Sequence, residues 1–188
     1  AALRQIRVMR RALEATGRKD PNNKAAREWY IRCVSLELQT LERLGEDRYA
    51  LRCVELLEQV FEPLPWKKTW PLLRLKEFEK AEEMIVATEK TGRFPLRVLN
   101  DRLSLESQFN RRADSYQTAT KLVGSLKPED DQEVYLNNRA LTAWATFKFD
   151  EVEADLKSNL KYEDKYSRGT AHVGLAGLYV QQGKLADA

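Results

Sequence analysis

Apolar residues recur three or four positions apart along almost the whole chain, with polar residues between them. This pattern predicts helices of ordinary globular length separated by short breaks. The breaks coincide with turn-forming residues, including the stretch 20–23, Gly45, Gly92 and Gly183. The predicted helices cover residues 2–16, 22–43, 47–61, 76–91, 95–109, 112–126, 131–146, 149–162, 168–182 and from 185 onward.

Short breaks between consecutive helices are typical of antiparallel helical hairpins. The stretch 62–75 does not follow the pattern, because it contains Pro65 and Pro71. A proline inside a helix costs roughly 3 kcal/mol, since it removes a hydrogen bond and clashes with the preceding turn. We therefore predict an irregular connection over 62–75, or residues that are missing from the sequence there.

One position after each short break recurs at a nearly fixed distance. It is occupied by Ala81, Tyr116, Val152 and Ala188, at spacings of 35, 36 and 36 residues. A further unit places Ala50 at this position, only 31 residues before Ala81. A fixed period in the thirties with two helices per period is typical of an α-solenoid.

The residues at several other positions also follow a known repeat. They are Leu175, Ala176, Tyr179, Gly183 and Ala188 in the last unit and Ala140, Phe149, Val152 and Leu156 in the unit before it. In this pattern the chain resembles the tetratricopeptide repeat (TPR) family, most clearly over 133–188 and less clearly over 76–126 and 24–61. Three residues depart from the family pattern, because Phe147 replaces the turn glycine, Ala143 the tyrosine and Tyr116 the alanine.

The resemblance implies one array over residues 1–188, an all-α fold with a right-handed superhelical α-solenoid of about five antiparallel helix pairs. It also implies that the first helices of successive pairs line a concave groove that binds a protein or peptide partner. The groove-facing residues would be Val134, Asn137, Asn138, Leu141, Trp144, Thr170, Val173, Gly174, Gly177 and Gln181.

Each of these residue types suits a binding role in its own way. Asparagine side chains can both donate to and accept from an extended peptide backbone. Trp144 could anchor a partner or, equally, pack between neighbouring hairpins. Gly174 and Gly177 are expected to leave a shallow, open strip. In family members that hold acidic chaperone tails, the clamp uses lysine and arginine at the positions of Thr170 and Gly174, which argues against that ligand class here.

Candidate chemistry does not favour an enzyme. Cys33, Cys53 and His172 lack the spacing of a zinc site, and the sequence contains no familiar catalytic motif. Cys33 and Cys53 are expected on the two helices of one hairpin, as small buried apolar residues rather than nucleophiles. We therefore predict a non-catalytic scaffold or adaptor without a cofactor or metal. An alternative is a nucleic-acid-binding helical repeat, because residues 1–32 carry nine basic and three acidic side chains and 66–70 read WKKTW. A third possibility is a regulatory or assembly region of a larger enzyme.

The chain has no apolar run near the roughly 18 residues that a membrane-spanning helix needs. We therefore expect no membrane insertion and a cytoplasmic location, although a removed leader stays open because the chain does not begin with Met. The chain begins within one predicted helix and stops at the first turn of another. It is therefore expected to be a fragment of a longer protein, and its exposed terminal hairpins are expected to self-associate.

Overall fold

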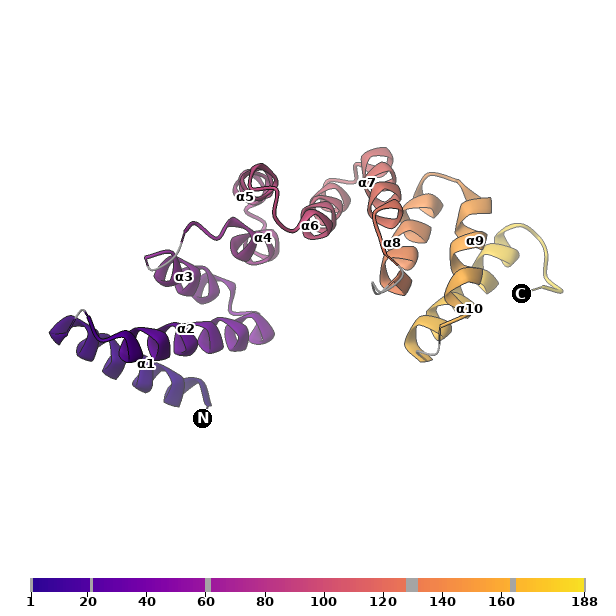
Figure 1. The fold of residues 1–188 in the computed structure, drawn as a ribbon. Helices are drawn as coiled ribbons and strands as arrows, with labels where there is room; N and C mark the ends of the chain where they lie inside the picture. Colours follow the sequence, from indigo (N-terminus) through magenta and orange to yellow (C-terminus); the bar gives the residue numbers. More distant parts are fainter. Residues whose placement is uncertain (1, 21, 60–61, 128–131, 163–164, 188) are drawn as a thin grey trace. The chain divides into compact units, whose positions relative to one another are not determined.

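The computed structural model describes the chain apart from residues 1, 21, 60–61, 128–131, 163–164 and 188. Within the described part the fold is all-helical, with ten helices and no strand (Figure 1). The predicted all-α class is therefore confirmed. The helices belong to two compact units, residues 1–93 and 94–188, and each unit has a core of its own.

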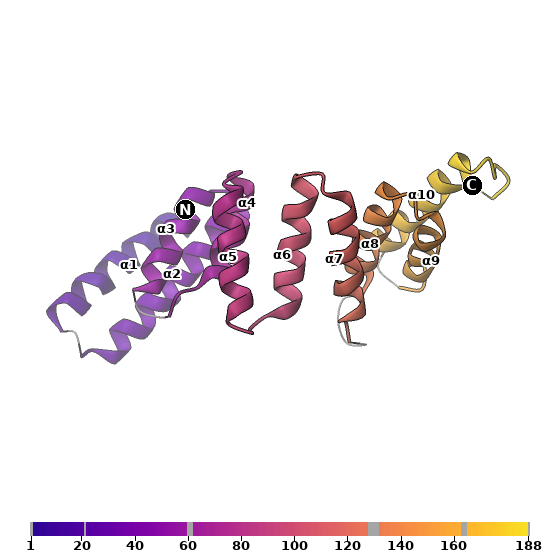
Figure 2. The same ribbon diagram turned by 90° about the horizontal axis from the view of Figure 1, so that it is seen from above.

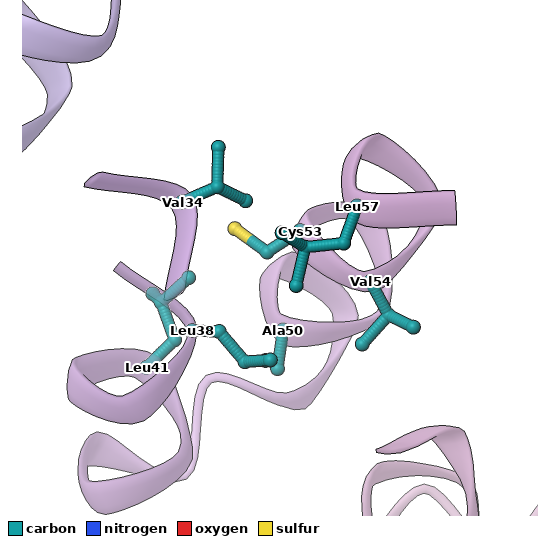
Figure 3. Packing of buried hydrophobic residues seen from close by; sticks show 7 residues of the cluster. All are labelled: Val34, Leu38, Leu41, Ala50, Cys53, Val54 and Leu57. Carbon is teal, nitrogen blue, oxygen red and sulfur yellow. The ribbon is translucent and has the colours of Figure 1, made fainter. Parts of the chain in front are cut away.

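The first unit contains α1 (Ala2–Lys19), α2 (Lys24–Leu44), α3 (Asp47–Glu58), α4 (Pro65–Arg74) and α5 (Phe78–Lys90). Each helix packs on the next one along the chain. The side chain of Asn23 caps α2 by accepting a hydrogen bond from the Ala26 amide at 2.9 Å. The core lies between α2 and α3 (Figure 3) and is formed by Val34, Leu38, Leu41, Ala50, Cys53, Val54 and Leu57.

The irregular connection predicted over 62–75 is wrong, because α4 occupies most of that stretch. Pro65 begins this helix, where its missing amide hydrogen leaves no bond unmade. Pro71 lies inside the helix, and it is buried together with Leu72 and Leu73. Burying a leucine side chain stabilises by about 1.5–3 kcal/mol, so the packing of these residues offsets the proline penalty of about 3 kcal/mol. The helix α4 supplies the first member of the hairpin that it forms with α5.

The second unit contains α6 (Pro95–Gln108), α7 (Arg112–Gly124), α8 (Gln132–Ala145), α9 (Phe149–Asn159) and α10 (Lys165–Gln181), drawn from another direction in Figure 2. Its largest core cluster joins α8, α9 and α10 and is formed by Ala140, Ala143, Val152, Leu156, Ala171, Leu175 and Leu178. The helix predicted from 185 onward is not present over 185–187, which form a turn. Ala188 lies outside the described residues.

Five helices of the described part end in the same kind of turn. A residue with a left-handed backbone follows each helix, with φ of 71°, 60°, 54°, 61° and 73° at Gly45, Lys76, Asn110, Phe147 and Gly183. The amide of the next residue then donates to the carbonyl five positions earlier, as from Glu46 to Leu41 at 3.0 Å and from Lys148 to Ala143 at 2.9 Å. This is the hydrogen bond of a Schellman turn. Phe147 thus adopts the conformation that a glycine would favour at this position.

The recurring turn also fixes the register of the repeated position. The residue five places after each left-handed residue is buried, and within the described part these residues are Ala50, Ala81, Ser115 and Val152. The prediction of Tyr116 in the third unit is therefore wrong by one residue. One residue turns a helix by about 100°, so Tyr116 points elsewhere and its hydroxyl donates to the Glu151 carboxylate of α9.

Among the described residues, no helix combines the length and the apolar character needed to cross a membrane.

Candidate functional site

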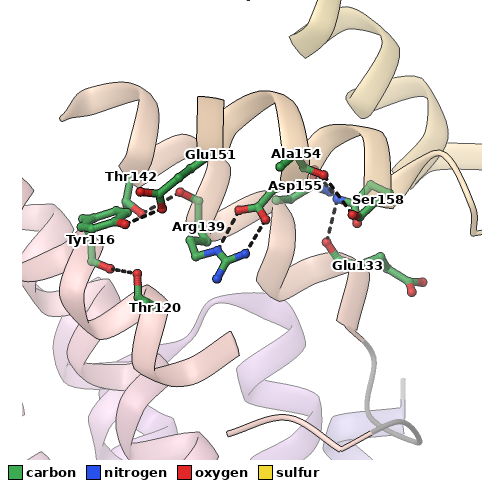
Figure 4. A network of polar contacts seen from close by, with 11 residues as sticks. Tyr116, Thr120, Glu133, Arg139, Thr142, Glu151, Ala154, Asp155 and Ser158 are labelled. Atoms are coloured by element: carbon green, nitrogen blue, oxygen red, sulfur yellow. Dashed lines mark hydrogen bonds and ion pairs between the residues drawn. The ribbon is translucent and has the colours of Figure 1, made fainter. Parts of the chain in front are cut away.

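A buried polar network fixes the orientation of α8 against α9 (Figure 4). The Arg139 guanidinium donates to the Asp155 carboxylate, with Nε and Oδ2 2.8 Å apart, and Asp155 is only 2% exposed. This hydrogen-bonded carboxylate raises the pKa of Arg139. The side-chain amide of Asn159, which is fully buried, donates to the Glu133 carbonyl at 3.1 Å and to Asn137 Oδ1 at 2.9 Å. These bonds determine which face of α8 is turned away from α9.

A second set of contacts attaches the α6–α7 hairpin to α9. The Tyr116 hydroxyl donates to Glu151 (Figure 4), and the Lys148 ammonium lies 4.8 Å from the centre of the Tyr116 ring. Helix α7 also packs directly on α8. These contacts hold the α6–α7 hairpin beside α8, where residues of the three helices line the cleft described below.

The outward faces of α8 and α10 carry exposed apolar side chains. Val134 and Leu141 lie seven residues apart, on one face of α8, and Leu141 is 69% exposed. Val173 and Val180 have the same spacing on α10, and Val173 is 76% exposed. Six of the ten predicted groove residues, apolar and polar together, are exposed. They are Val134, Leu141, Thr170, Val173, Gly177 and Gln181.

Three other predicted groove residues are partly buried. The side-chain oxygen of Asn137 accepts from Asn159 of α9, so this residue contributes to packing within the hairpin. Asn138 forms no side-chain hydrogen bond with any described residue. The Trp144 ring packs edge-on against Phe149, with the ring centres 6.4 Å apart, and contacts the core shared by α8, α9 and α10. Of the two roles predicted for Trp144, packing between hairpins is the one that these contacts support.

The open strip expected at Gly174 and Gly177 is wrong for Gly174. A Cβ atom at Gly174 would lie 2.8 Å from Cδ1 of Leu156, so the Leu156 side chain already fills that space. Gly174 therefore permits the close approach of α9 and α10. Gly177 is exposed, and a Cβ atom there would be 3.5 Å from the Trp144 ring, an ordinary contact.

Beside Leu141 the structure forms a small cleft of about 180 Å³. Its lining comes from α6, the α6–α7 turn, α7 and α8, and consists of Ser107, Asn110, Arg112, Ser115, Leu141, Thr142 and Ala145. The Ser115 hydroxyl is buried and has no hydrogen-bond partner among the described residues. At the rim, Arg112 Nε donates to Asn110 Oδ1 at 3.0 Å.

The groove residues predicted from the sequence all lie on α8 and α10, so the α6–α7 side of this cleft was not predicted. The signal that could have found Ser115 is Asn110, since asparagine adopts the left-handed conformation more readily than most residues. Counting five residues from Asn110, as from Gly45 to Ala50, leads to Ser115.

The chemistry of the cysteines and the histidine gives no support to catalysis. Cys33 and Cys53 are buried as free thiols on α2 and α3, as predicted. Burial raises the pKa of Cys53 to about 11, so its thiol is protonated near neutral pH and is a poor nucleophile. His172 is exposed on α10. Within the described ranges no group of three or more His, Cys, Asp or Glu side chains could hold a metal ion.

Neither a scan against protein-family models nor a search of the curated proteins finds a match for this sequence. The resemblance to the tetratricopeptide repeat family therefore rests on the residue pattern.

Proposed function

We propose that this chain is a TPR-like α-solenoid that acts as a non-catalytic scaffold or adaptor. In this proposal it binds an extended segment of a partner protein along the outward faces of α8 and α10. Five turns share the same hydrogen bond, and four of them place a described, buried residue at the same position of the following helix, which supports a repeat architecture.

The observation that carries the binding proposal is the cleft beside Leu141. Its volume of about 180 Å³ is below the range of roughly 300–1,000 Å³ typical of small-molecule sites, and it suits one side chain of a partner. An apolar side chain there would cover Leu141, and burying a leucine stabilises by about 1.5–3 kcal/mol. The Ser115 hydroxyl, which lacks an internal partner, would donate to a carbonyl of the bound peptide.

The nucleic-acid alternative has less support, because several cations on which it depends are already paired. In the basic helix α1, Arg7 and Arg10 both bond the buried carboxylate of Glu37, at 2.7 and 2.9 Å. In the WKKTW stretch, Lys68 forms an ion pair with Glu58 at 2.6 Å. A regulatory or assembly role in a larger enzyme would use the same peptide-binding surface.

Selection from a displayed library of random peptides tests the proposal, followed by fluorescence polarisation with the selected peptide. We expect Leu141→Lys to weaken binding about tenfold or more, because it removes at least about 1.4 kcal/mol of apolar contact. Ser115→Ala should weaken binding about fivefold, the loss of one hydrogen bond of about 1 kcal/mol. The matched control Leu36→Lys, which replaces an exposed leucine of α2, should leave the affinity unchanged.

The Ser115→Ala variant separates a binding role from a structural one. Its hydroxyl has no partner among the described residues, so its removal should not lower the free energy of unfolding. Equal affinity of the wild type, Leu141→Lys and Ser115→Ala for the selected peptides would show that this cleft is not the binding site. Failure to select any peptide, together with binding of labelled single-stranded RNA, would favour the nucleic-acid alternative.

A further inference from the structure

The first unit contains a second, larger cleft, formed by α1, α2 and α3. Its volume is about 350 Å³, within the range of roughly 300–1,000 Å³ that small-molecule sites occupy. The lining consists of Arg7, Arg10, Arg11, Glu14, Glu37, Tyr49, Arg52, Cys53 and Leu56. Four guanidinium groups thus face two carboxylates, which leaves an excess of two positive charges in the lining.

One wall of the cleft already binds an oxyanion from the protein itself. The Glu37 carboxylate is buried, at 3% exposure, and accepts from Nε of Arg7 on one oxygen and Nε of Arg10 on the other. Arg10 also approaches Glu14, with 3.8 Å between Nη1 and Oε2. The Arg7 guanidinium lies over the Tyr49 ring, 5.6 Å from its centre. Arg7 and Arg10 are therefore held in place and neutralised by the protein.

The remaining two cations are not neutralised in this way. Arg11 comes from α1 and Arg52 from α3, and both line the same cleft. Within the described part of the chain, neither side chain forms a hydrogen bond or an ion pair. A guanidinium group presents its donors as a planar fork, a geometry that matches the oxygens of a phosphate or carboxylate. Two such forks on different helices, with a cleft between them, leave room for an anion.

We infer that this cleft binds a small ligand through a phosphate group held by Arg11 and Arg52. A phosphate dianion matches the excess of two positive charges, whereas a single carboxylate would neutralise only half of it. Binding a nucleic-acid backbone favours cations spread over a face or stripe. Here the cations line a cleft, which suits a compact anion. This site is separate from the peptide-binding surface proposed for α8 and α10, and the two can be tested independently.

Isothermal titration calorimetry with inorganic phosphate and with pyrophosphate, at low ionic strength and neutral pH, tests the inference on the whole chain. We expect one site per chain. The double variant Arg11→Ala, Arg52→Ala should weaken binding about tenfold or more, because two charge-assisted contacts are lost. The matched control Lys24→Ala, Arg43→Ala removes the same charge from the two ends of α2, outside the cleft, and should bind as the wild type does.

Further variants and ligands show whether binding depends on the guanidinium geometry and which kind of phosphate the cleft prefers. Arg52→Lys keeps the charge but not the fork, so its affinity should lie between those of the wild type and the double variant. Tighter binding of pyrophosphate than of phosphate would identify the ligand as a diphosphate, and the reverse as a phosphate monoester. Arg11 and Arg52 are exposed, so the double variant should fold, and a circular dichroism spectrum matching the wild type would verify this.

Three results would overturn the inference. The first is the absence of binding of both phosphates to the wild-type chain. The second is equal affinity of the wild type and the double variant, or an equal loss in the control variant, which would indicate a general effect of charge. The third is binding of a single-stranded RNA probe that neither pyrophosphate nor the double variant reduces, since this would place the phosphate contacts elsewhere.

Discussion

Replacing the glycines of α10 with alanine should change the stability of this helix by amounts that their surroundings determine. Gly169 has no neighbouring atom within 4 Å of an added Cβ, whereas Gly177 would contact Trp144 at 3.5 Å. At Gly174 the added Cβ would lie 2.8 Å from Leu156, closer than real Cβ atoms approach. The three substitutions are chemically identical, so differences between them report local packing.

The magnitudes follow from two opposing effects. Alanine favours a helix interior over glycine by about 0.8–1 kcal/mol, so Gly169→Ala and Gly177→Ala should each stabilise α10 by roughly that amount. At Gly174 the same gain is opposed by overpacking, because the buried Leu156 methyl must move by roughly 0.6 Å to reach an ordinary contact. Overpacking a core costs about 1–3 kcal/mol. Gly174→Ala should therefore range from neutral to destabilising by about 2 kcal/mol.

Hydrogen exchange measured by mass spectrometry on peptides of α10 is the suitable assay, because it reports the opening of this helix alone. A change of 1.4 kcal/mol corresponds to tenfold in protection, so exchange should slow about three- to fivefold in Gly169→Ala and Gly177→Ala. In Gly174→Ala it should be unchanged or faster. Peptides of α2, in the other unit, should exchange as in the wild type and serve as the internal control.

Equal slowing of exchange in all three variants would refute the reasoning. It would mean that Leu156 moves aside at no cost and that the contact between α9 and α10 does not require glycine at position 174.

Two further predictions concern buried charges. Arg139→Met leaves the buried Asp155 carboxylate without its ion-pair partner, and should lower the free energy of unfolding, measured by urea denaturation, by about 2–4 kcal/mol. Lys157→Met breaks an exposed ion pair with Glu153 and should leave the free energy of unfolding nearly unchanged. Similar losses in both variants would contradict a special role for the buried pair. Burial raises the pKa of Glu106 above its ordinary value of 4.5, so the folded state keeps the Glu106 proton to a higher pH than the unfolded state does. The free energy of unfolding should therefore fall as the pH rises from the pKa of Glu106 in the unfolded state to its higher pKa in the folded state. Glu106→Gln should remove this decrease and be more stable than the wild type near pH 7. If the urea midpoints of the variant depend on pH as those of the wild type do, the titration of Glu106 is not the cause of the decrease.

The positions of most helices could be predicted because helix formation depends on neighbouring residues. The spacing of apolar residues marked nine of the ten helices in the described part, and the breaks at 20–23 and at Gly45 marked the two ends of α2 to within two residues. The exception is α4, whose prolines argue against a helix locally. Its stability comes from the burial of Pro71, Leu72 and Leu73 against neighbouring helices, which local preferences do not include.

The candidate cleft could be predicted only on its α8 side. Leu141 and Val134 are apolar residues outside the packed stripe of α8, and their exposure follows from the helical period. The α6–α7 side depends on the register of one hairpin, which a spacing count misplaced by one residue at Tyr116. The left-handed turn at Asn110 sets that register and places Ser115 in the buried position.

The sequence by itself thus determined the helical class, most helix boundaries and the burial of Cys33 and Cys53, because backbone hydrogen bonds and side-chain periodicity act within a few residues. Only the tertiary structure decided that Leu156 fills the space at Gly174 and that Asn159 bonds Asn137. These contacts join residues about twenty positions apart in the chain. They depend on how one helix lies across another, and a pattern read along a single helix contains no information about that crossing.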